Sequence, residues 1–159
     1  MFQKTLTFDD ISIIPQYSEI ESRKTIDISN KLGDFYLDLP IIASPMKDIS
    51  EETMCITMAK NGALGILHRF CSIDRQQEMG KRINKESVIF GAAIGVSGDF
   101  FERFETMIEI GAKIICIDVA CGNHILVKKA LEKIKGYSKI DHIHLMARQR
   151  CRAEKALLI

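Results

Sequence analysis

The chain has 159 residues, 47% of them hydrophobic, so it is long enough for one globular domain and too short for most two-domain architectures. Its 22 Lys and Arg and 21 Asp and Glu residues give a formal net charge of +1, which provides no overall field to attract nucleic acid or an anionic membrane. No stretch approaches the roughly 18 apolar residues of a membrane helix, and the N-terminus has acidic residues where a signal peptide needs an apolar run. We therefore expect a cytoplasmic protein that binds neither nucleic acid nor membrane.

The cysteines and histidines indicate neither a disulfide framework nor a metal site. The 5 cysteines form no CxxC pair and stand in ordinary apolar or loop contexts, which favours reduced thiols. His142 and His144 lie two apart on an expected strand, but the sequence suggests no third ligand near them.

Residues 1–38 are predicted to be an extended leader with a turn at 30–34, where Gly33 stands. Beyond the leader, short β-branched runs alternate with amphipathic stretches, a pattern typical of βαβ units and a parallel sheet. The continuous apolar character of the runs suits strands that are covered on both faces. Strands are expected at 39–44, 63–68, 88–94, 113–118 and 142–147.

The stretches between the strands predict helices with recognisable ends. Ser50, Ser72 and Ser97 precede the first three, as residues that begin helices commonly do. Gly62 and Gly111 each follow a helix and precede a strand, where a left-handed residue that ends a helix is expected.

Two of these helices have well-defined faces. The third has Phe101, Phe104, Met107 and Ile108 on one face, with Arg103 among the charged residues opposite. The fourth is predicted over residues 125–135, and its inward side chains are expected to be Leu126, Val127, Ala130, Leu131 and Ile134. Periodicity alone leaves two architectures open, a (βα) barrel and a doubly wound sheet.

Five blocks of sequence resemble one known family. Residues 6–18 (LTFDDISIIPQYS) are similar to the opening of the inosine-monophosphate dehydrogenases and GMP reductases. Four later blocks resemble that family in the same order: 39–46 (LPIIASPM), 65–70 (GILHRF), 91–99 (GAAIGVSGD) and 117–123 (IDVACGN). The resemblance implies an α/β fold of the (βα)8 TIM-barrel type, of which residues 1–159 form the N-terminal part, about the first five βα units of a single domain.

The resemblance also implies a chemistry. In the family a cysteine thiolate attacks C2 of the purine, and a hydride passes between that carbon and a nicotinamide cofactor. That cysteine lies on a glycine-rich loop after the sixth strand, so we expect no catalytic residue in this chain and no activity from residues 1–159 alone. Neither Cys71 nor Cys121 matches the family's nucleophile.

The expected binding residues follow the ends of strands. By resemblance, Ser44 and Met46 contact the purine nucleotide, and the cofactor contacts Arg69, Asp118, Val119, Ala120 and Gly122. From the residues alone, Arg69 could equally be a solvated arginine at the start of a helix, and Asp118 a helix-capping aspartate. Lys47 departs from the aspartate usual in the family.

The sequence is compatible with three functions. Residues 79–85 lead directly into the third strand without the regulatory CBS pair of most dehydrogenases, which favours a GMP reductase that converts GMP and NADPH to IMP and ammonia. The alternatives are an IMP dehydrogenase that lacks the insert and uses NAD, and an inactive half barrel with a structural or binding role. The family further implies a homo-oligomer, a tetramer, whose ligands are GMP and IMP.

Residues 147–152 (ARQRCR) replace the Ala-Gly-Asn-Val-Ala-Thr or similar sequence usual in the family. A local frameshift would convert Gly-Asn-Val-Ala codons into Arg-Gln-Arg-Cys, and ordinary divergence is the alternative. The chain could also be part of a longer gene product.

Overall fold

In the computed structural model, which describes residues 6–138 and 142–148, the centre of the fold is a five-stranded curved sheet. Its order is β3-β4-β5-β6-β7, and every neighbouring pair is parallel, as predicted. The strands are β3 (Ile42–Ala43), β4 (Leu64–Leu67), β5 (Gly91–Ile94), β6 (Ile114–Asp118) and β7 (His144–Arg148).

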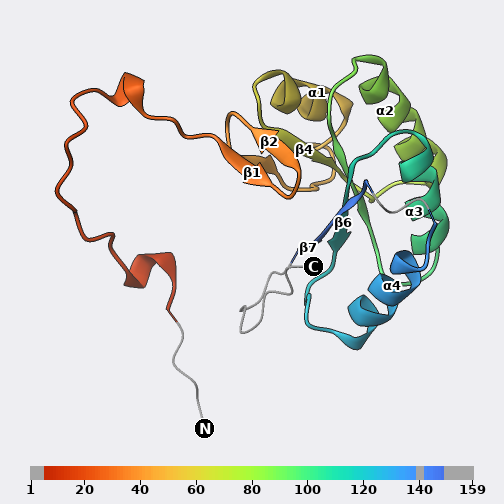
Figure 1. Cartoon of the computed structure of the whole chain (residues 1–159). Helices are drawn as coiled ribbons and strands as arrows, with labels where there is room; N and C mark the ends of the chain where they lie inside the picture. The colour runs from red at the N-terminus through yellow and green to blue at the C-terminus, as the bar shows by residue number, and fades with distance from the viewer. Residues whose placement is uncertain (1–5, 139–141, 149–159) are drawn as a thin grey trace, which may run out of the picture.

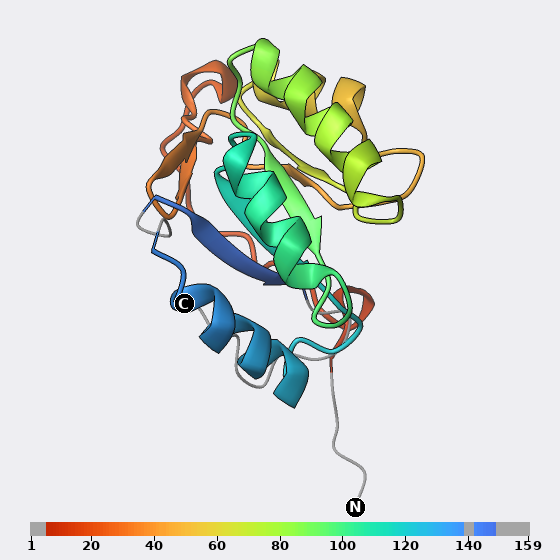
Figure 2. The ribbon, with the colours of Figure 1, turned by 90° about the vertical axis from the view of Figure 1, so that its right-hand side faces the viewer.

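Four helices follow the first four of these strands and cover one face of the sheet (Figure 2). They are α1 (Glu52–Lys60), α2 (Ile73–Lys85), α3 (Phe100–Glu109) and α4 (Ile125–Lys135). Strand, helix and parallel strand alternate with the helices outside, so the predicted α/β fold, the first part of a TIM barrel, is confirmed.

The two faces of the sheet belong to different clusters of buried side chains. Leu67, Ala92, Ile94, Ile115 and Ile117 pack with the helices. Their alternates along the strands, namely Leu64, Ile66, Ala93, Ile114 and Cys116, pack on the concave face. This alternation follows the two-residue period of a strand, and it explains why the strands are apolar throughout.

A hairpin packs against the concave cluster, which corrects the expectation of an extended leader up to residue 38. β1 (Asn30–Leu32) pairs antiparallel with β2 (Phe35–Leu37), and Gly33 has a φ of 58° in the predicted turn between them. Leu37 is buried against the concave cluster, with Leu32 and Phe35 partly buried beside it. The hairpin therefore supplies apolar surface that the sheet face needs.

Residues 6–29 do run in extended form, interrupted by the short 3-10 turns η1 (Phe8–Asp10) and η2 (Arg23–Thr25). This segment leads away from the sheet (Figure 1) and leaves Ile13 95% exposed.

The first strand of the sheet is shorter than the predicted 39–44. Pro40 has no N–H to donate to a neighbouring strand, and the Ile41 N–H donates to the Leu39 carbonyl at 2.7 Å. Strand pairing therefore begins only at Ile42.

Helix ends were predicted with mixed success. The Ser72 side chain accepts a hydrogen bond from the Arg75 N–H at 3.2 Å, and Gly62 and Gly111 have φ angles of 72° and 97°, as expected. Ser50 does not cap α1, because its hydroxyl donates to the Ser44 carbonyl instead. Asp99, rather than Ser97, precedes the first residue of α3.

Two predicted helix positions were wrong. Leu126 is 40% exposed, because it lies in the first turn of α4 away from the inner face, although Val127, Ala130, Leu131 and Ile134 are buried as predicted. Arg103 is buried rather than solvated, and its partners are polar groups at the end of the sheet. None of the helices among the described residues has the length and apolar character needed to cross a membrane.

The close approach of α1 to β4 predicts a destabilising substitution. A Cβ at Gly65 would lie 2.5 Å from the Cα of Cys55, so Gly65→Ala forces two backbones apart. We expect a loss of about 1–3 kcal/mol in the free energy of unfolding, measured by chemical denaturation. Gly136→Ala is the matched control, because its Cβ would meet nothing closer than 3.5 Å, and an equal loss in both variants would contradict the packing argument.

Candidate functional site

A cavity of about 330 Å³ opens at the carboxyl ends of β3, β4 and β6. Its lining residues come from three loops that lie far apart in sequence. They are Pro45, Met46, Lys47, Arg69, Phe70, Asp118, Val119 and Ala120. We call this space the strand-end cavity.

Five of the seven predicted binding residues line this cavity: Met46, Arg69, Asp118, Val119 and Ala120. Ser44 follows β3 at the same edge, but its carbonyl accepts a hydrogen bond from the Ser50 hydroxyl and it does not line the cavity. Gly122 lines a neighbouring space beside α4. Lys47 and Phe70 also line the cavity, and the sequence had given no site role to either.

Arg69 and Asp118 connect two of the loops. The Arg69 Nη2 donates to the Asp118 carbonyl at 3.1 Å, and its Nε lies 3.7 Å from the Asp118 Oδ2. That Nε is buried and has no hydrogen-bond partner among the described residues. The guanidinium also lies over the Phe70 ring, 5.0 Å from its centroid. Arg69 is therefore held at the cavity and is not freely solvated.

The capping interpretation of Asp118 is not supported by the geometry. His124 stands at the N-cap of α4, and its Nδ1 accepts a hydrogen bond from the Leu126 N–H at 3.2 Å. Asp118 is buried at the end of β6 and faces Arg69. Its carboxylate therefore lies on the cavity side of the sheet.

His68 holds the backbone of the loop that follows β4. It is buried, and its Nδ1 accepts a hydrogen bond from the Phe70 N–H at 3.1 Å. Because Nδ1 is the acceptor, a neutral ring carries its proton on Nε2, which lies 3.4 Å from the Glu51 Oε1. These contacts fix the direction in which the chain leaves β4.

Two of the described cysteines are poorly suited to nucleophilic work. Burial raises the pKa of Cys55 to about 12. Burial also raises the pKa of Cys71, against the opposing effect of the Arg103 and Arg75 charges. Since the thiolate is the reactive form, both side chains remain weak nucleophiles at neutral pH. Cys121 is exposed on the loop before α4.

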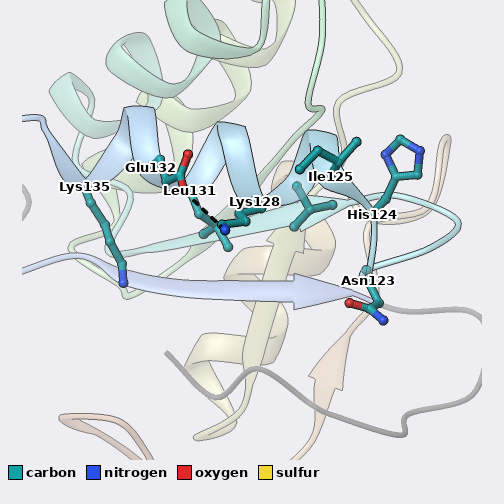
Figure 3. Close-up of a pocket in the computed structure, with 9 residues that line it drawn as sticks. Asn123, His124, Ile125, Lys128, Leu131, Glu132 and Lys135 are labelled. Carbon is teal, nitrogen blue, oxygen red and sulfur yellow. Dashed lines mark ion pairs between the residues drawn. The ribbon is translucent and has the colours of Figure 1, made fainter.

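A larger cavity of about 570 Å³ lies along α4 and includes Gly122 (Figure 3). Buried Val127 and Leu131 form part of its wall, and Lys128 and Glu132 form an exposed ion pair at 3.9 Å. Neither Arg69 nor Asp118 lines it. We therefore choose the smaller strand-end cavity as the candidate site, because polar side chains converge on it. Within residues 6–138 and 142–148, no group of three His, Cys, Asp or Glu side chains could hold a metal ion.

Comparison with known families identifies the family of the chain. Residues 5–154 match the model of the IMP dehydrogenase / GMP reductase domain. The parallel sheet, with a polar cavity at the carboxyl ends of its strands, places the chain in the class of α/β barrel proteins. The chain belongs to the IMP dehydrogenase / GMP reductase family.

Relatives with both names are similar to the chain. The inosine-5'-monophosphate dehydrogenase of Korarchaeum cryptofilum is 41% identical over 97 residues, which cover 60% of this chain and 20% of that protein. The GMP reductase of Leishmania donovani is 43% identical over 81 residues, covering 50% and 16%. The GMP reductase of Streptococcus pyogenes is 33% identical over 137 residues, covering 85% and 42%. The matched segment thus spans less than half the length of each of these relatives.

Thiol burial predicts the order of alkylation. Among Cys55, Cys71 and Cys121 in folded chain treated with iodoacetamide at pH 7.5, Cys121 should react first, half-buried Cys71 more slowly, and Cys55 not at all. Raising the pH to 10 should still leave Cys55 unmodified, because burial raises its pKa to about 12 and the thiol is almost entirely protonated at pH 10. Peptide mass spectrometry measures this order, with urea-unfolded chain as the control. Early modification of Cys55 in folded chain would refute the packing of α1 on β4.

Proposed function

We propose that this chain provides the first part of a purine-nucleotide oxidoreductase site, and that the reaction is the NADPH-dependent reduction of GMP to IMP and ammonia. The observation that carries the proposal is the convergence of Met46, Arg69 and Asp118 on one cavity at the strand ends of a family barrel. Barrel enzymes place their sites at this edge.

The residues present fit part of a nicotinamide dinucleotide. The Arg69 side chain lines the cavity and is 32% exposed, so the guanidinium N–H groups that do not face Asp118 can donate to an oxygen of a ligand. Lys47 and Arg69 bring two cationic side chains to the cavity, which suits a phosphate. Phe70 is 48% exposed and offers a ring face for packing.

When bound, the cofactor would supply the hydride that the reaction transfers. In our proposal the chain binds and orients it. Arg69 donates to a phosphate or ribose oxygen, the Asp118 carboxylate accepts from a ribose hydroxyl, and the backbone of 119–122 allows close approach. Ser44 and Met46 lie beside the purine nucleotide.

We propose a reductase rather than a dehydrogenase because α2 passes to β5 through residues 86–90 alone. There is therefore no room at this point for the CBS pair that most dehydrogenases of the family carry. An NAD-dependent IMP dehydrogenase that lacks the insert is the alternative, and the similarity to the inosine-5'-monophosphate dehydrogenase of Korarchaeum cryptofilum supports it. The same proposal holds that the complete enzyme also contains a nucleophilic cysteine, the rest of the barrel and the other subunits of a homo-oligomer.

The isolated chain 1–159 should catalyse neither GMP reduction with NADPH nor IMP oxidation with NAD. A covalent nucleophile contributes more rate than the remaining binding groups can supply. Absorbance at 340 nm measures both reactions, and a Cys121→Ser variant is assayed in parallel. Turnover that disappears in this variant would make the chain an enzyme by itself and overturn the assignment of the nucleophile.

Binding of NADPH should depend on Arg69. Loss of one charge-assisted hydrogen bond costs roughly 1.5–3 kcal/mol, so Arg69→Gln should weaken NADPH binding by about tenfold or more in isothermal titration. Lys128→Gln, which removes a positive charge from the α4 cavity, is the control and should bind as the wild type does. Equal weakening in both variants would show that only net charge matters. Tighter binding of NAD than NADPH would favour the dehydrogenase.

A further inference from the structure

Gln76 on α2 and Arg103 on α3 form a buried polar pair beneath the candidate site. Their exposed fractions are 0% and 5%. The Gln76 Nε2 donates to the carbonyls of His68 and Ala93, both at 3.0 Å. Its Oε1 accepts from the Arg103 Nη1 at 2.8 Å. One amide therefore links the end of β4, the strand β5 and the helix α3.

The guanidinium of Arg103 extends this connection to two loops. Its Nη2 donates to the Cys71 carbonyl at 3.0 Å and to the Asp99 Oδ2 at 2.6 Å. Cys71 follows β4, and Asp99 stands at the start of α3. The loop after β4 is thereby tied to the loop after β5 through a single side chain.

The segment 68–71, which we call the Arg69 loop, is held at both ends by this pair. Gln76 holds the His68 carbonyl, and Arg103 holds the Cys71 carbonyl. Between these points, Arg69 reaches across to the carbonyl of Asp118, 49 residues away in sequence. The position of the guanidinium therefore depends on where the two carbonyls are fixed.

Burying these polar groups carries a cost that apolar side chains would avoid. A buried guanidinium must be paired and hydrogen-bonded, and apolar side chains of similar volume commonly stabilise a fold as well or better. The polar pair fixes the positions of the carbonyls that it binds, because each hydrogen bond is effective only over a narrow range of distance and angle. The Arg69 loop is therefore restricted to one conformation more strictly than packing alone would require.

We propose that Gln76 and Arg103 are positioning residues, which fix the Arg69 loop so that the Arg69 guanidinium stays against Asp118 at the strand-end cavity. This inference rests on the proposed function, because it takes Arg69 to be the group that a nucleotide cofactor meets. Displacements of about 1 Å at such groups already cost on the order of a hundredfold in rate.

The test follows Arg69 itself by NMR in ¹⁵N-labelled chain 1–159. The Nε–Hε signal of Arg69 is assigned by its absence in Arg69→Gln, and Asp118→Asn shows its position when the ion pair is lost. In Gln76→Leu and Arg103→Lys, we expect the signal to move toward the Asp118→Asn position and its hydrogen exchange to accelerate about tenfold or more. Arg82→Gln, on the exposed side of α2, should leave the signal unchanged.

The outcomes separate a positioning role from a structural one. If both variants have lower melting temperatures while the Arg69 signal and its exchange stay as in the wild type, the pair is structural only and the proposal is wrong. If Gln76→Leu does not fold, Arg103→Lys decides by the same signal. A parallel titration with NADPH tests the proposed function separately. Wild-type chain that shows the expected Arg69 signals but no NADPH binding would contradict that function and leave the positioning result standing.

Discussion

Arg69 and Asp118 meet because β4, β5 and β6 pair in one parallel register. Ile66 lies opposite Gly91, and Ile94 lies opposite Ile117, so the carboxyl ends of the strands reach the same edge. Asp118 comes two and four residues after Cys116 and Ile114, which face the concave cluster, so its carboxylate also belongs to that face. A shift of one residue in β6 would turn it toward the helices and remove it from the cavity.

Local patterns were sufficient for most elements of this fold. The expected strand 113–118 and helix 125–135 agree with β6 and α4, because apolar periodicity and flanking residues depend on neighbours in the sequence. The hairpin of β1 and β2 was missed, since its strands have only three residues each and are stabilised by packing on the concave face. The first strand is shorter than predicted because Pro40 has no N–H to donate to a neighbouring strand, a local effect that the prediction did not take into account.

The strand-end cavity was predictable in position and less so in detail. By resemblance, Met46, Arg69 and the segment 118–120 were expected at one end of the sheet, and they line this cavity, while their roles in binding stay predictions. Arg103 was placed on a solvated face, since a helical period treats every arginine as polar surface. Asp99 stands four residues before it, a spacing that predicts a pair on the helix surface, but Gln76 is 27 residues away and meets Arg103 only in the folded chain, so the sequence does not indicate its burial. The side chains that support a site are thus harder to predict than those that line it.

We propose that the strand-end cavity is the part of this chain that binds nucleotide and cofactor. Amide chemical shifts of ¹⁵N-labelled chain, followed during titration first with GMP and then with NADPH, test it most directly. We expect shifts at Met46 and Lys47 with GMP and at 69–70 and 118–120 with NADPH, each set saturating together. Shifts confined to residues 122–135 along α4, or none at either set, would contradict it.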